Sequence, residues 1–443
     1  MRESTVIAEG VVSLVCTGCG DATADPWQWS CATCGPGVRR EVRYAPDAGR
    51  RMRERLGVRP FDMWRYAELL PVAAPSVRHS SLAVGGTPVL EAPLLARHLG
   101  VARVVIKDEG RNASGSLKDR ATAVGVSLAL ADGRSAIACA STGNAAASTA
   151  TLAAGVGLPA VVLIPERTAA GKLAQLRACG AVVCRVPASY DDVWDLCSEL
   201  SDRAGWLNRN CAVNPYLVEG KKTAGLELAE QLGEQMTDWV AVGVGDGCTI
   251  AGIARGLIEA HALGMIPRLP RLLGVQPTGV QPLVRAFHEG AAPHTASPQT
   301  LADGLNVGRP RNAAKALHAV RELGGTFVAV SDDAIVDAIG WVARWSGVLP
   351  EPAAAAAFAG VAAARAAMIL APGESVAIVN TGNGLKDPGA IDRVHALAEP
   401  MDVSRDAGEA LGMIMAALEE SSKRSRGRTV PHPTHVPSEH VDV

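Results

Sequence analysis

The sequence predicts an α/β protein with mainly parallel sheets. From about residue 85 to 400, short runs rich in Val, Ile and Ala alternate with longer Ala/Leu-rich amphipathic stretches. The short runs lack polar alternation, so both faces of each strand should be covered. Their alternation with helical segments indicates parallel strands joined by helices. The predicted strands are residues 102–109, 135–142, 159–165, 181–187, 239–245, 271–277, 326–331 and 375–382.

Composition and charge narrow the class of protein. The 443 residues are 48% hydrophobic and 20% charged, as in ordinary folded chains, and the length suggests two or three domains. A net charge of -2 indicates no nucleic-acid or membrane-surface partner. No apolar run reaches the roughly 18 residues of a membrane span, and Glu3 and Glu9 interrupt the N-terminus. Because six cysteines are scattered through apolar segments, we expect free thiols and a cytoplasmic protein.

Three parts are predicted along the chain. Residues 1–45 form a cysteine-bearing module, and an Arg-rich stretch with helical character, 47–57, leads into a core of residues 46–400. Residues 401–443 are expected to form a C-terminal helix and a disordered tail, because the last stretch is polar and Pro-rich.

The N-terminal module carries a metal-binding pattern. Two CxxC pairs separated by a short loop place four thiolates at tetrahedral reach, which predicts a structural zinc ribbon. The loop is acidic and has no basic residue, which disfavours a nucleic-acid module and favours a structural or oligomer-contact role. The alternative is free thiols in an ordered turn. The predicted ligands are Cys16, Cys19, Cys31 and Cys34.

Ligands bind at the carboxyl ends of strands in open α/β sheets, and polar loops follow four of the predicted strands. The first loop leads to Lys118 at a predicted helix start. The helix dipole there disfavours a cation and lowers the lysine pKa, which suits an amine that forms and exchanges imines. The alternative is an exposed lysine paired with Asp119. Asp119 and Arg120 are expected to stabilise this helix start.

The second and third loops offer anion sites. Ser141, Thr142, Gly143 and Asn144 form a turn whose N–H groups could hold a carboxylate and whose Asn could hold a phenolic oxygen, or they simply cap a helix. The third turn lacks GK[ST], fits GxGxxG loosely and is followed by no ribose-binding acid, so it favours a phosphate monoester over a dinucleotide. It consists of Gly245, Asp246, Gly247, Cys248 and Thr249.

The fourth loop carries Thr381, a neutral hydroxyl suited to a pyridine nitrogen. Such a partner favours elimination or replacement chemistry over transamination. Together the loops supply an amine, a carboxylate cradle, a phosphate cradle and a neutral ring partner. This combination predicts pyridoxal 5'-phosphate as the cofactor.

Several motifs then resemble threonine synthase and its relatives in the tryptophan synthase β-like superfamily. The motifs, in unbroken order from about residue 60 to 395, are WRYAELLPV, KDEGRNASGSLKDR, ASTGN, VGDGCTI, NPYLVEGKKTAG, LPEPAAAAA and TGNGLKDP. The resemblance implies pyridoxal-phosphate fold type II: two open α/β domains with the cofactor in the cleft between them, behind a small ribbon with four cysteines. The smaller domain would be about residues 118–205, the larger would come from the flanking segments, and a homodimer is expected.

The resemblance also implies roles for the loop residues. Lys118 would carry the cofactor as a Schiff base and, once freed, remove the α-proton of an amino-acid substrate. A leaving group would then depart from Cβ or Cγ, and water or another nucleophile would add. Asn144 would contact the phenolic oxygen, the turn from Gly245 to Thr249 the cofactor phosphate, Thr381 the ring nitrogen, and Ser141, Thr142 and Gly143 the substrate carboxylate.

Departures from the family pattern leave the substrate open. Relatives acting on O-phosphohomoserine typically have an arginine where this chain has Leu217, and Ala145 and Ala354 also replace polar residues. Residues 302–308 are more similar to amino-acid dehydratases. Glu351 could face the cofactor or cap a helix. The cations that could still serve an anion are Lys221, Lys222, Lys107 and Arg111.

The alternatives are therefore a serine/threonine dehydratase-type β-elimination and a replacement with a nucleophile other than water. A dinucleotide-dependent dehydrogenase is disfavoured by the glycine spacing. A zinc-ribbon module with an inactive core is disfavoured by the intact GSLKDR sequence around Lys118.

Overall fold

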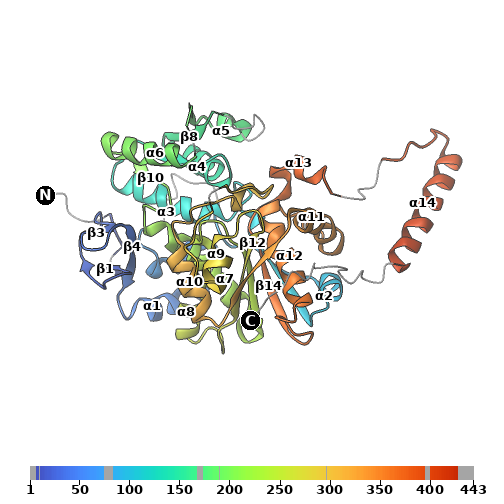
Figure 1. The fold of residues 1–443 in the computed structure, drawn as a ribbon, viewed down its shortest axis with the longest axis horizontal. Coiled ribbons are helices and arrows are strands. Elements are labelled where there is room, and N and C mark those ends of the chain that lie inside the picture. The colour runs from blue at the N-terminus through green and yellow to red at the C-terminus, as the bar shows by residue number, and fades with distance from the viewer. Residues whose placement is uncertain are drawn as a thin grey trace.

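The chain folds around three β-sheets (Figure 1). The computed structural model describes residues 6–8, 10–73, 83–166, 173–188, 190–295, 297–394 and 400–427. The N-terminal sheet is antiparallel, in the order β2-β1-β4-β3. Its strands are β1 (Val11–Cys16), β2 (Ala22–Thr23), β3 (Ser30–Cys31) and β4 (Gly35–Tyr44).

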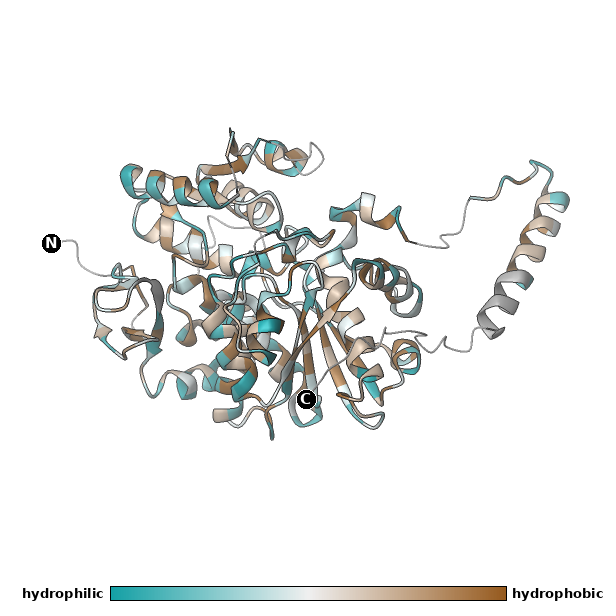
Figure 2. Ribbon diagram, in the orientation of Figure 1, coloured by the Kyte–Doolittle hydropathy of each residue, from teal (hydrophilic) through white to brown (hydrophobic). Residues whose placement is uncertain are grey.

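The largest sheet has six strands in the order β13-β12-β11-β14-β6-β5, and only the edge strand β5 runs antiparallel. Every residue of β11 is buried, because apolar clusters cover both faces of the sheet. Figure 2 shows these central strands as mostly hydrophobic ribbons. The strands are β5 (Val89–Glu91), β6 (Arg103–Asp108), β11 (Trp239–Gly243), β12 (Arg271–Pro277), β13 (Thr326–Val330) and β14 (Ser375–Asn380).

A second, wholly parallel sheet has the order β10-β7-β8-β9. Its strands are β7 (Ile137–Ala140), β8 (Ala160–Pro165), β9 (Val182–Val186) and β10 (Leu207–Asn208). The predicted α/β class with parallel sheets is confirmed, and all eight predicted strands form. Strands β5 and β10 were not predicted, because three and two residues are too few for a recognisable pattern.

Helices connect the strands, and the helix predicted at 47–57 is present as α1. The first part of the motif WRYAELLPV lies in the 3₁₀ helix η2 (Met63–Leu69). The other 3₁₀ helices are η1 (Leu56–Val58), η3 (Glu109–Arg111), η5 (Gly233–Gln235), η6 (Asp303–Leu305) and η7 (Gly384–Lys386). The α-helices are α1 (Ala48–Arg55), α2 (Pro93–Leu99), α3 (Lys118–Ala131), α4 (Asn144–Gly155), α5 (Ala174–Ala178), α6 (Tyr190–Ala204), α7 (Tyr216–Leu232), α8 (Cys248–Ala262), α9 (Pro282–His288), α10 (Ala313–Glu322), α11 (Asp332–Ser346), α12 (Pro352–Ala366), α13 (Pro388–Ile391) and α14 (Ala407–Gly427).

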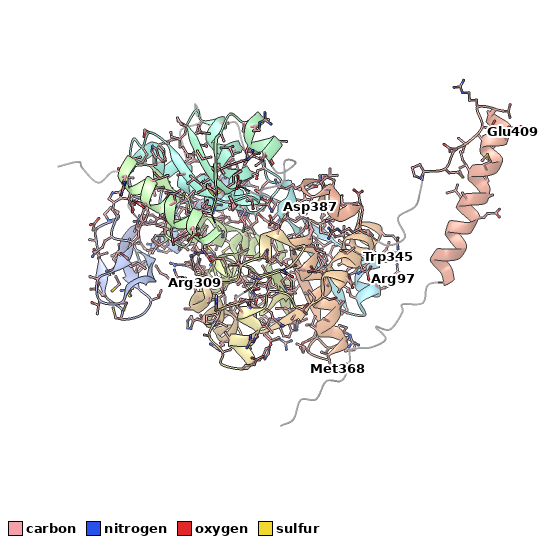
Figure 3. The ribbon with its side chains drawn as sticks, turned by 45° about the horizontal axis from the view of Figure 1, so that its top comes forward. Arg97, Arg309, Trp345, Met368, Asp387 and Glu409 are labelled. Carbon is pink, nitrogen blue, oxygen red and sulfur yellow. The ribbon has the colours of Figure 1, made fainter. Side chains whose placement is uncertain are left out.

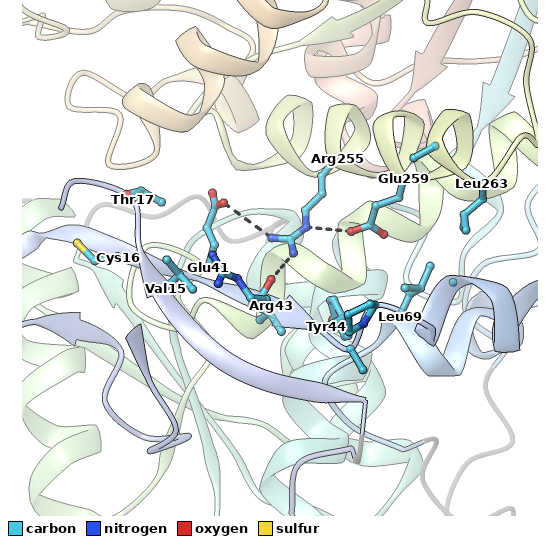
Figure 4. A pocket seen from close by; sticks show the side chains of 15 residues that line it. Val15, Cys16, Thr17, Glu41, Arg43, Tyr44, Leu69, Arg255, Glu259 and Leu263 are labelled. Atoms are coloured by element: carbon cyan, nitrogen blue, oxygen red, sulfur yellow. Dashed lines mark hydrogen bonds and ion pairs between the residues drawn. The ribbon is translucent and has the colours of Figure 1, made fainter. Parts of the chain in front are cut away.

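The N-terminal sheet is attached to the core through α7 and α8. Arg255 of α8 reaches toward β4, where it donates to the carbonyl oxygen of Val42 and lies 3.9 Å from Glu41 (Figure 4). Tyr44 of β4 donates to Glu219 of α7 at 2.9 Å. An open cavity of about 430 Å³ lies at this junction.

The C-terminal helix α14 stands apart from the body of the molecule in both views (Figures 1 and 3). Glu409 lies on this helix, whereas Arg97, Trp345 and Met368 lie on the flank of the body nearer to it (Figure 3). Leu411 is 61% exposed. The disordered tail was predicted from residue 421, but α14 continues to Gly427, so the prediction is wrong for residues 421–427. Residues 428–443 lie outside the described residues. In the described part of the chain, no helix has the length and apolar character needed to cross a membrane.

Candidate active site

The strand-end loops meet in one cavity of about 310 Å³. This volume lies within the range of roughly 300–1,000 Å³ that is usual for small-molecule sites. Loops that follow strands of both parallel sheets line the cavity. Every loop residue singled out in the sequence lies in this lining, namely Lys118, Ser141, Thr142, Gly143, Asn144, Gly245, Asp246, Gly247, Cys248, Thr249 and Thr381.

Lys118 is the first residue of α3, as predicted. Its loop is held against the Thr381 loop by the Leu117 amide, which donates to the carbonyl oxygen of Thr381 at 2.9 Å. Burial lowers the pKa of Lys118 to about 8, and the nearby charges of Lys221 and Arg209 contribute to that lowering. The sequence reasoning had named only the helix dipole as a cause.

The alternative pairing of Lys118 with Asp119 is wrong. Asp119 instead accepts hydrogen bonds from the Ser114 amide at 2.6 Å and the Ser114 hydroxyl at 2.5 Å, so it fixes the loop before the helix. Arg120 points into the core, where it bonds to Glu109 and Glu227 at 2.7 Å each. The first turn of α3 is therefore held by Asp119, while Arg120 belongs to a buried ion-pair network.

The glycine turn from Gly245 to Thr249 runs into the start of α8. Gly247 has a φ of +91°, which favours glycine. A Cβ added at Gly243, just before the turn, would lie 2.3 Å from the carbonyl oxygen of Ala353, so this approach also requires glycine. Among the described residues, the N–H groups of Gly245 to Thr249 have no protein acceptor. The start of a helix leaves such donors free, and they can bind a phosphate.

The carboxylate of Asp246 is turned toward neighbouring protein groups. It accepts from the Arg311 amide at 2.7 Å and from the Asn312 side chain at 2.5 Å. Burial raises the pKa of Asp246. Asp246 therefore positions the turn through its side chain, and its backbone N–H remains available for a ligand.

The second loop opens toward the cavity at Gly143. A Cβ added there would meet only Asp303, at 3.4 Å. The next residue, Asn144, donates its side-chain amide to both carboxylate oxygens of Glu351 at 2.7 Å. Glu351 immediately precedes α12, but its side chain forms no capping hydrogen bond and lines the cavity instead. Of the two roles considered for Glu351, the structure therefore favours the one in the site. Burial raises the pKa of Glu351.

Of the four cations proposed for an anion, only Lys221 lines the cavity. Lys222 pairs with Glu219 at 2.8 Å, Lys107 with Glu227 at 2.8 Å, and Arg111 with Asp108 at 3.0 Å.

Leu217 is fully buried and is not part of the cavity lining. It packs against α3, where its side chain would lie 3.2 Å from a Cβ added at Gly125.

Sequence reasoning missed Arg209, which lines the cavity directly after β10. The rule that ligands bind after strand ends would have identified it, but β10 itself was not predicted. The dehydratase-like stretch also reaches the site, since residues 303–307 line the cavity.

The four N-terminal cysteines form a separate cluster. Their sulfur atoms all lie within 4.8 Å of one another, and those of Cys19 and Cys31 are 3.6 Å apart. Four thiols at this spacing are compatible with a tetrahedral Zn²⁺ site.

The cavity fits a phosphate-bearing aldehyde. It places a half-buried lysine of lowered pKa beside a helix start with free N–H groups, and its glycine turn leaves room for an anion. The fold and this site define a pyridoxal-phosphate enzyme of fold type II. Residues 80–382 match the family described as "Pyridoxal-phosphate dependent enzyme", and the chain belongs to that family.

Named relatives are similar over most of the chain. The threonine synthase of Methanocaldococcus jannaschii is 39% identical over 80% of this chain and 87% of its own length. That of Methanosarcina acetivorans is 37% identical over 89% of this chain and 97% of its own length. Among solved structures, the processed form of threonine deaminase isoform 2 from Solanum lycopersicum has a TM-score of 0.60 and 25% identity, covering 71% of this chain and 88% of that one.

Proposed function

We propose that this chain is a pyridoxal-phosphate-dependent amino-acid lyase or synthase with threonine synthase-like carbon–oxygen lyase chemistry. The observation that carries the proposal is Lys118, a half-buried lysine of lowered pKa in the cavity where four strand-end loops converge. The threonine synthases named above, 37–39% identical over at least 80% of the chain, support the reaction class.

Each loop has a role in this proposal. Lys118 binds the cofactor aldehyde, the N–H groups from Gly245 to Thr249 bind its phosphate, and Thr381 faces its ring nitrogen. Asn144 contacts the phenolic oxygen and orients Glu351 through the bonds described above. Ser141, Thr142 and Gly143 receive the substrate carboxylate.

When bound, pyridoxal phosphate supplies an electron sink that acidifies the Cα–H bond of an amino acid. Lys118, once released by the substrate amine, takes the α-proton, because an amine with a pKa of about 8 is partly neutral near pH 7. The leaving group departs with the electron pair of its bond to Cβ or Cγ, and water adds in the synthase reaction.

A second candidate is a serine/threonine dehydratase-type β-elimination. The observation in its favour is that the dehydratase-like residues 303–307 line the cavity, and a threonine deaminase is among the similar structures. Replacement by a nucleophile other than water uses the same residues.

For the whole protein we propose a metal site, a division into three parts and a dimeric state. We propose a structural Zn²⁺ on Cys16, Cys19, Cys31 and Cys34, which is supported by their spacing. We propose a division into residues 1–45, a core of 46–400 with a smaller domain of about 118–205, and a C-terminal part, 401–443. A cytoplasmic homodimer is supported by the free cysteines and by the exposed apolar residues of α14.

The experiment is cofactor trapping followed by substrate discrimination. Purified protein is expected to turn yellow with pyridoxal phosphate, and borohydride should fix the cofactor on the peptide containing Lys118. The variant Lys118→Ala is the matched control and should not be labelled. A protein that stays colourless with added cofactor contradicts the proposal. O-phosphohomoserine, O-phosphoserine, serine and threonine are then compared by release of phosphate or keto acid, and metal content is measured alongside.

A further inference from the structure

Glu351 is a buried carboxyl in the cavity that has no cation partner. The residue is 7% exposed, and it lines the cavity. Among the described residues, its carboxylate forms no ion pair. Burial of a carboxylate without a paired cation is costly, and such groups concentrate at functional sites. The surroundings of Glu351 should therefore show what the carboxyl does.

The loop that carries Thr381 makes room for this carboxyl. The Glu351 amide donates to the carbonyl oxygen of Gly382 at 3.0 Å, which brings the two loops together. A Cβ added at Gly382 would overlap the carboxylate of Glu351. Any side chain at this position would displace the carboxylate. The carboxyl thus lies directly beside the loop that we assign to the cofactor ring.

Asn144 contacts the carboxyl from the other parallel sheet. Its Nδ2 atom donates to each oxygen of the Glu351 carboxylate at 2.7 Å. The two N–H groups of an amide diverge, whereas the two oxygens of a carboxylate lie side by side, so both contacts share one N–H group. The second N–H group of Asn144 stays available, and Asn144 lines the cavity. This amide can therefore bridge the carboxylate and an acceptor on a ligand.

The carboxylate determines the orientation of the Asn144 amide. An asparagine amide can exchange the positions of its nitrogen and oxygen by a half-turn, and its hydrogen-bond partners decide between the two. An ionised carboxyl only accepts hydrogen bonds, so it attracts the nitrogen of Asn144 and repels the oxygen. The hydrogen bond from Asn144 and the charges of Lys386 and Lys118 favour the ionised form of Glu351 and offset part of the cost of burial.

We propose that Glu351 is a positioning residue for the cofactor: through Asn144 it keeps an N–H donor on the phenolic oxygen and so favours the deprotonated form of that oxygen. The inference rests on the proposed function, since it concerns the bound cofactor. It goes beyond the contact of Asn144 alone, because an amide without the carboxylate can offer its donor or its acceptor. A hydrogen bond donated to an oxygen stabilises its charged form, whereas a carbonyl oxygen in the same place requires the phenol to keep its proton.

The absorbance of the bound cofactor tests the inference. The deprotonated phenol gives the yellow form, and the protonated phenol absorbs at shorter wavelength. We expect Glu351→Gln to lower the ratio of long- to short-wavelength absorbance at neutral pH about 3- to 10-fold, the range of one ordinary hydrogen bond. A glutamine has nearly the same shape, but it can face either end of the Asn144 amide. An unchanged ratio overturns the inference.

Asp387→Asn is the matched control. The charge of Asp387 acts on the carboxyl of Glu351, but Asp387 neither lines the cavity nor bonds to Asn144. This variant removes a nearby negative charge without removing the contact to the amide. Its absorbance ratio should change less than about twofold. A loss as large as that of Glu351→Gln overturns the inference, because general electrostatics would then explain both variants.

A double mutant shows whether Glu351 acts through Asn144. Asn144→Ala should itself lower the absorbance ratio, and the addition of Glu351→Gln should then change the ratio little. An undiminished effect of Glu351→Gln in the Asn144→Ala background overturns the inference. Gly382→Ala provides the test if Glu351→Gln does not fold, because its methyl group displaces the same carboxylate, and it should lower the ratio likewise.

Cofactor loading of each variant is measured in parallel. Borohydride fixes the bound cofactor on the peptide containing Lys118, so the absorbance ratio is compared only between equally labelled proteins. A variant that is labelled and as yellow as the wild type contradicts the role of Glu351. Failure of the proposed function is distinct, since the wild-type protein would then not be labelled at all.

Discussion

Two groups of buried cations in this molecule differ in how their charge is balanced. In the core, Lys107 and Arg120 pair with Glu109 and Glu227, and all four side chains are fully buried. In the cavity, Arg209 and Lys221 are just as deeply buried, but among the described residues they have no carboxylate partner. We therefore interpret the paired group as part of what stabilises the fold, and the group without carboxylate partners as a candidate ligand site.

The balanced group joins distant parts of the chain. Lys107 lies near the end of β6, Glu109 starts η3, Arg120 lies in the first turn of α3, and Glu227 lies on α7. The Lys107 amine also donates to the carbonyl oxygen of Thr87 at 2.7 Å. Since Arg120 is two residues after Lys118, this group fixes the first turn of α3 and so helps to position Lys118, the proposed Schiff-base lysine. None of its four side chains lines the cavity.

The largest expected effect comes from breaking the balanced group. Arg120→Met leaves Glu109 and Glu227 facing each other without their shared cation, and removing one partner of a buried ion pair costs about 3–5 kcal/mol. We expect a corresponding loss in the free energy of unfolding, measured by urea denaturation of the apo-protein. A loss below about 1 kcal/mol would contradict the structural role assigned to this group.

The second-largest expected effect is a loss of turnover. Lys118→Ala removes the amine that we propose moves the α-proton, and turnover is expected to fall about 10²- to 10⁴-fold, the usual contribution of a positioned base. The fold should persist, because Lys118 forms no ion pair among the described residues. Turnover is measured by phosphate or keto-acid release, and the urea midpoint serves as the control. Wild-type turnover in this variant would show that another residue carries the chemistry.

The sequence predicted most of the site because its signals are local. Each predicted strand is an apolar run, and the polar and glycine residues that follow four of these strands, such as Lys118, Asn144 and Thr381, line the cavity. These patterns need no tertiary information. The alternation of strands and helices was sufficient to predict the parallel sheets.

The unbalanced cations could not be predicted in the same way. Arg209 follows a strand of two residues, which leaves no pattern in the sequence. Lys221 and Lys222 are adjacent, and only the rotation of about 100° per residue along α7 sends one to the cavity and the other to Glu219. Leu217 departs from a family motif, but the packing of α3 against α7 determines the surroundings of its side chain.

The pH dependence of cofactor binding links the two regions through Lys118. The amine must be neutral to attack the cofactor aldehyde, and its pKa is lowered to about 8. The rate of reconstitution of the apo-protein is therefore expected to rise with pH, with its midpoint near pH 8 and a plateau above it, measured by the increase in cofactor absorbance. In Lys221→Met a neighbouring positive charge is gone, so the midpoint should move to higher pH. An unchanged midpoint would mean that burial alone sets the pKa of Lys118.

The smallest expected effect is the change in stability of Arg209→Met, and it compares the two groups of cations most directly. Arg209→Met removes a buried cation, as Arg120→Met does, but no carboxylate loses its partner. The Thr122 hydroxyl, the Cys211 sulfur and the carbonyl oxygen of Lys118 lose a donor, while a buried charge without a carboxylate partner disappears from the apo-protein. These contributions oppose each other. We expect the free energy of unfolding of the apo-protein to change by less than about 1 kcal/mol. If Arg209→Met destabilised the apo-protein as strongly as Arg120→Met, the cavity cations would be structural, and charge balance would not separate the two groups.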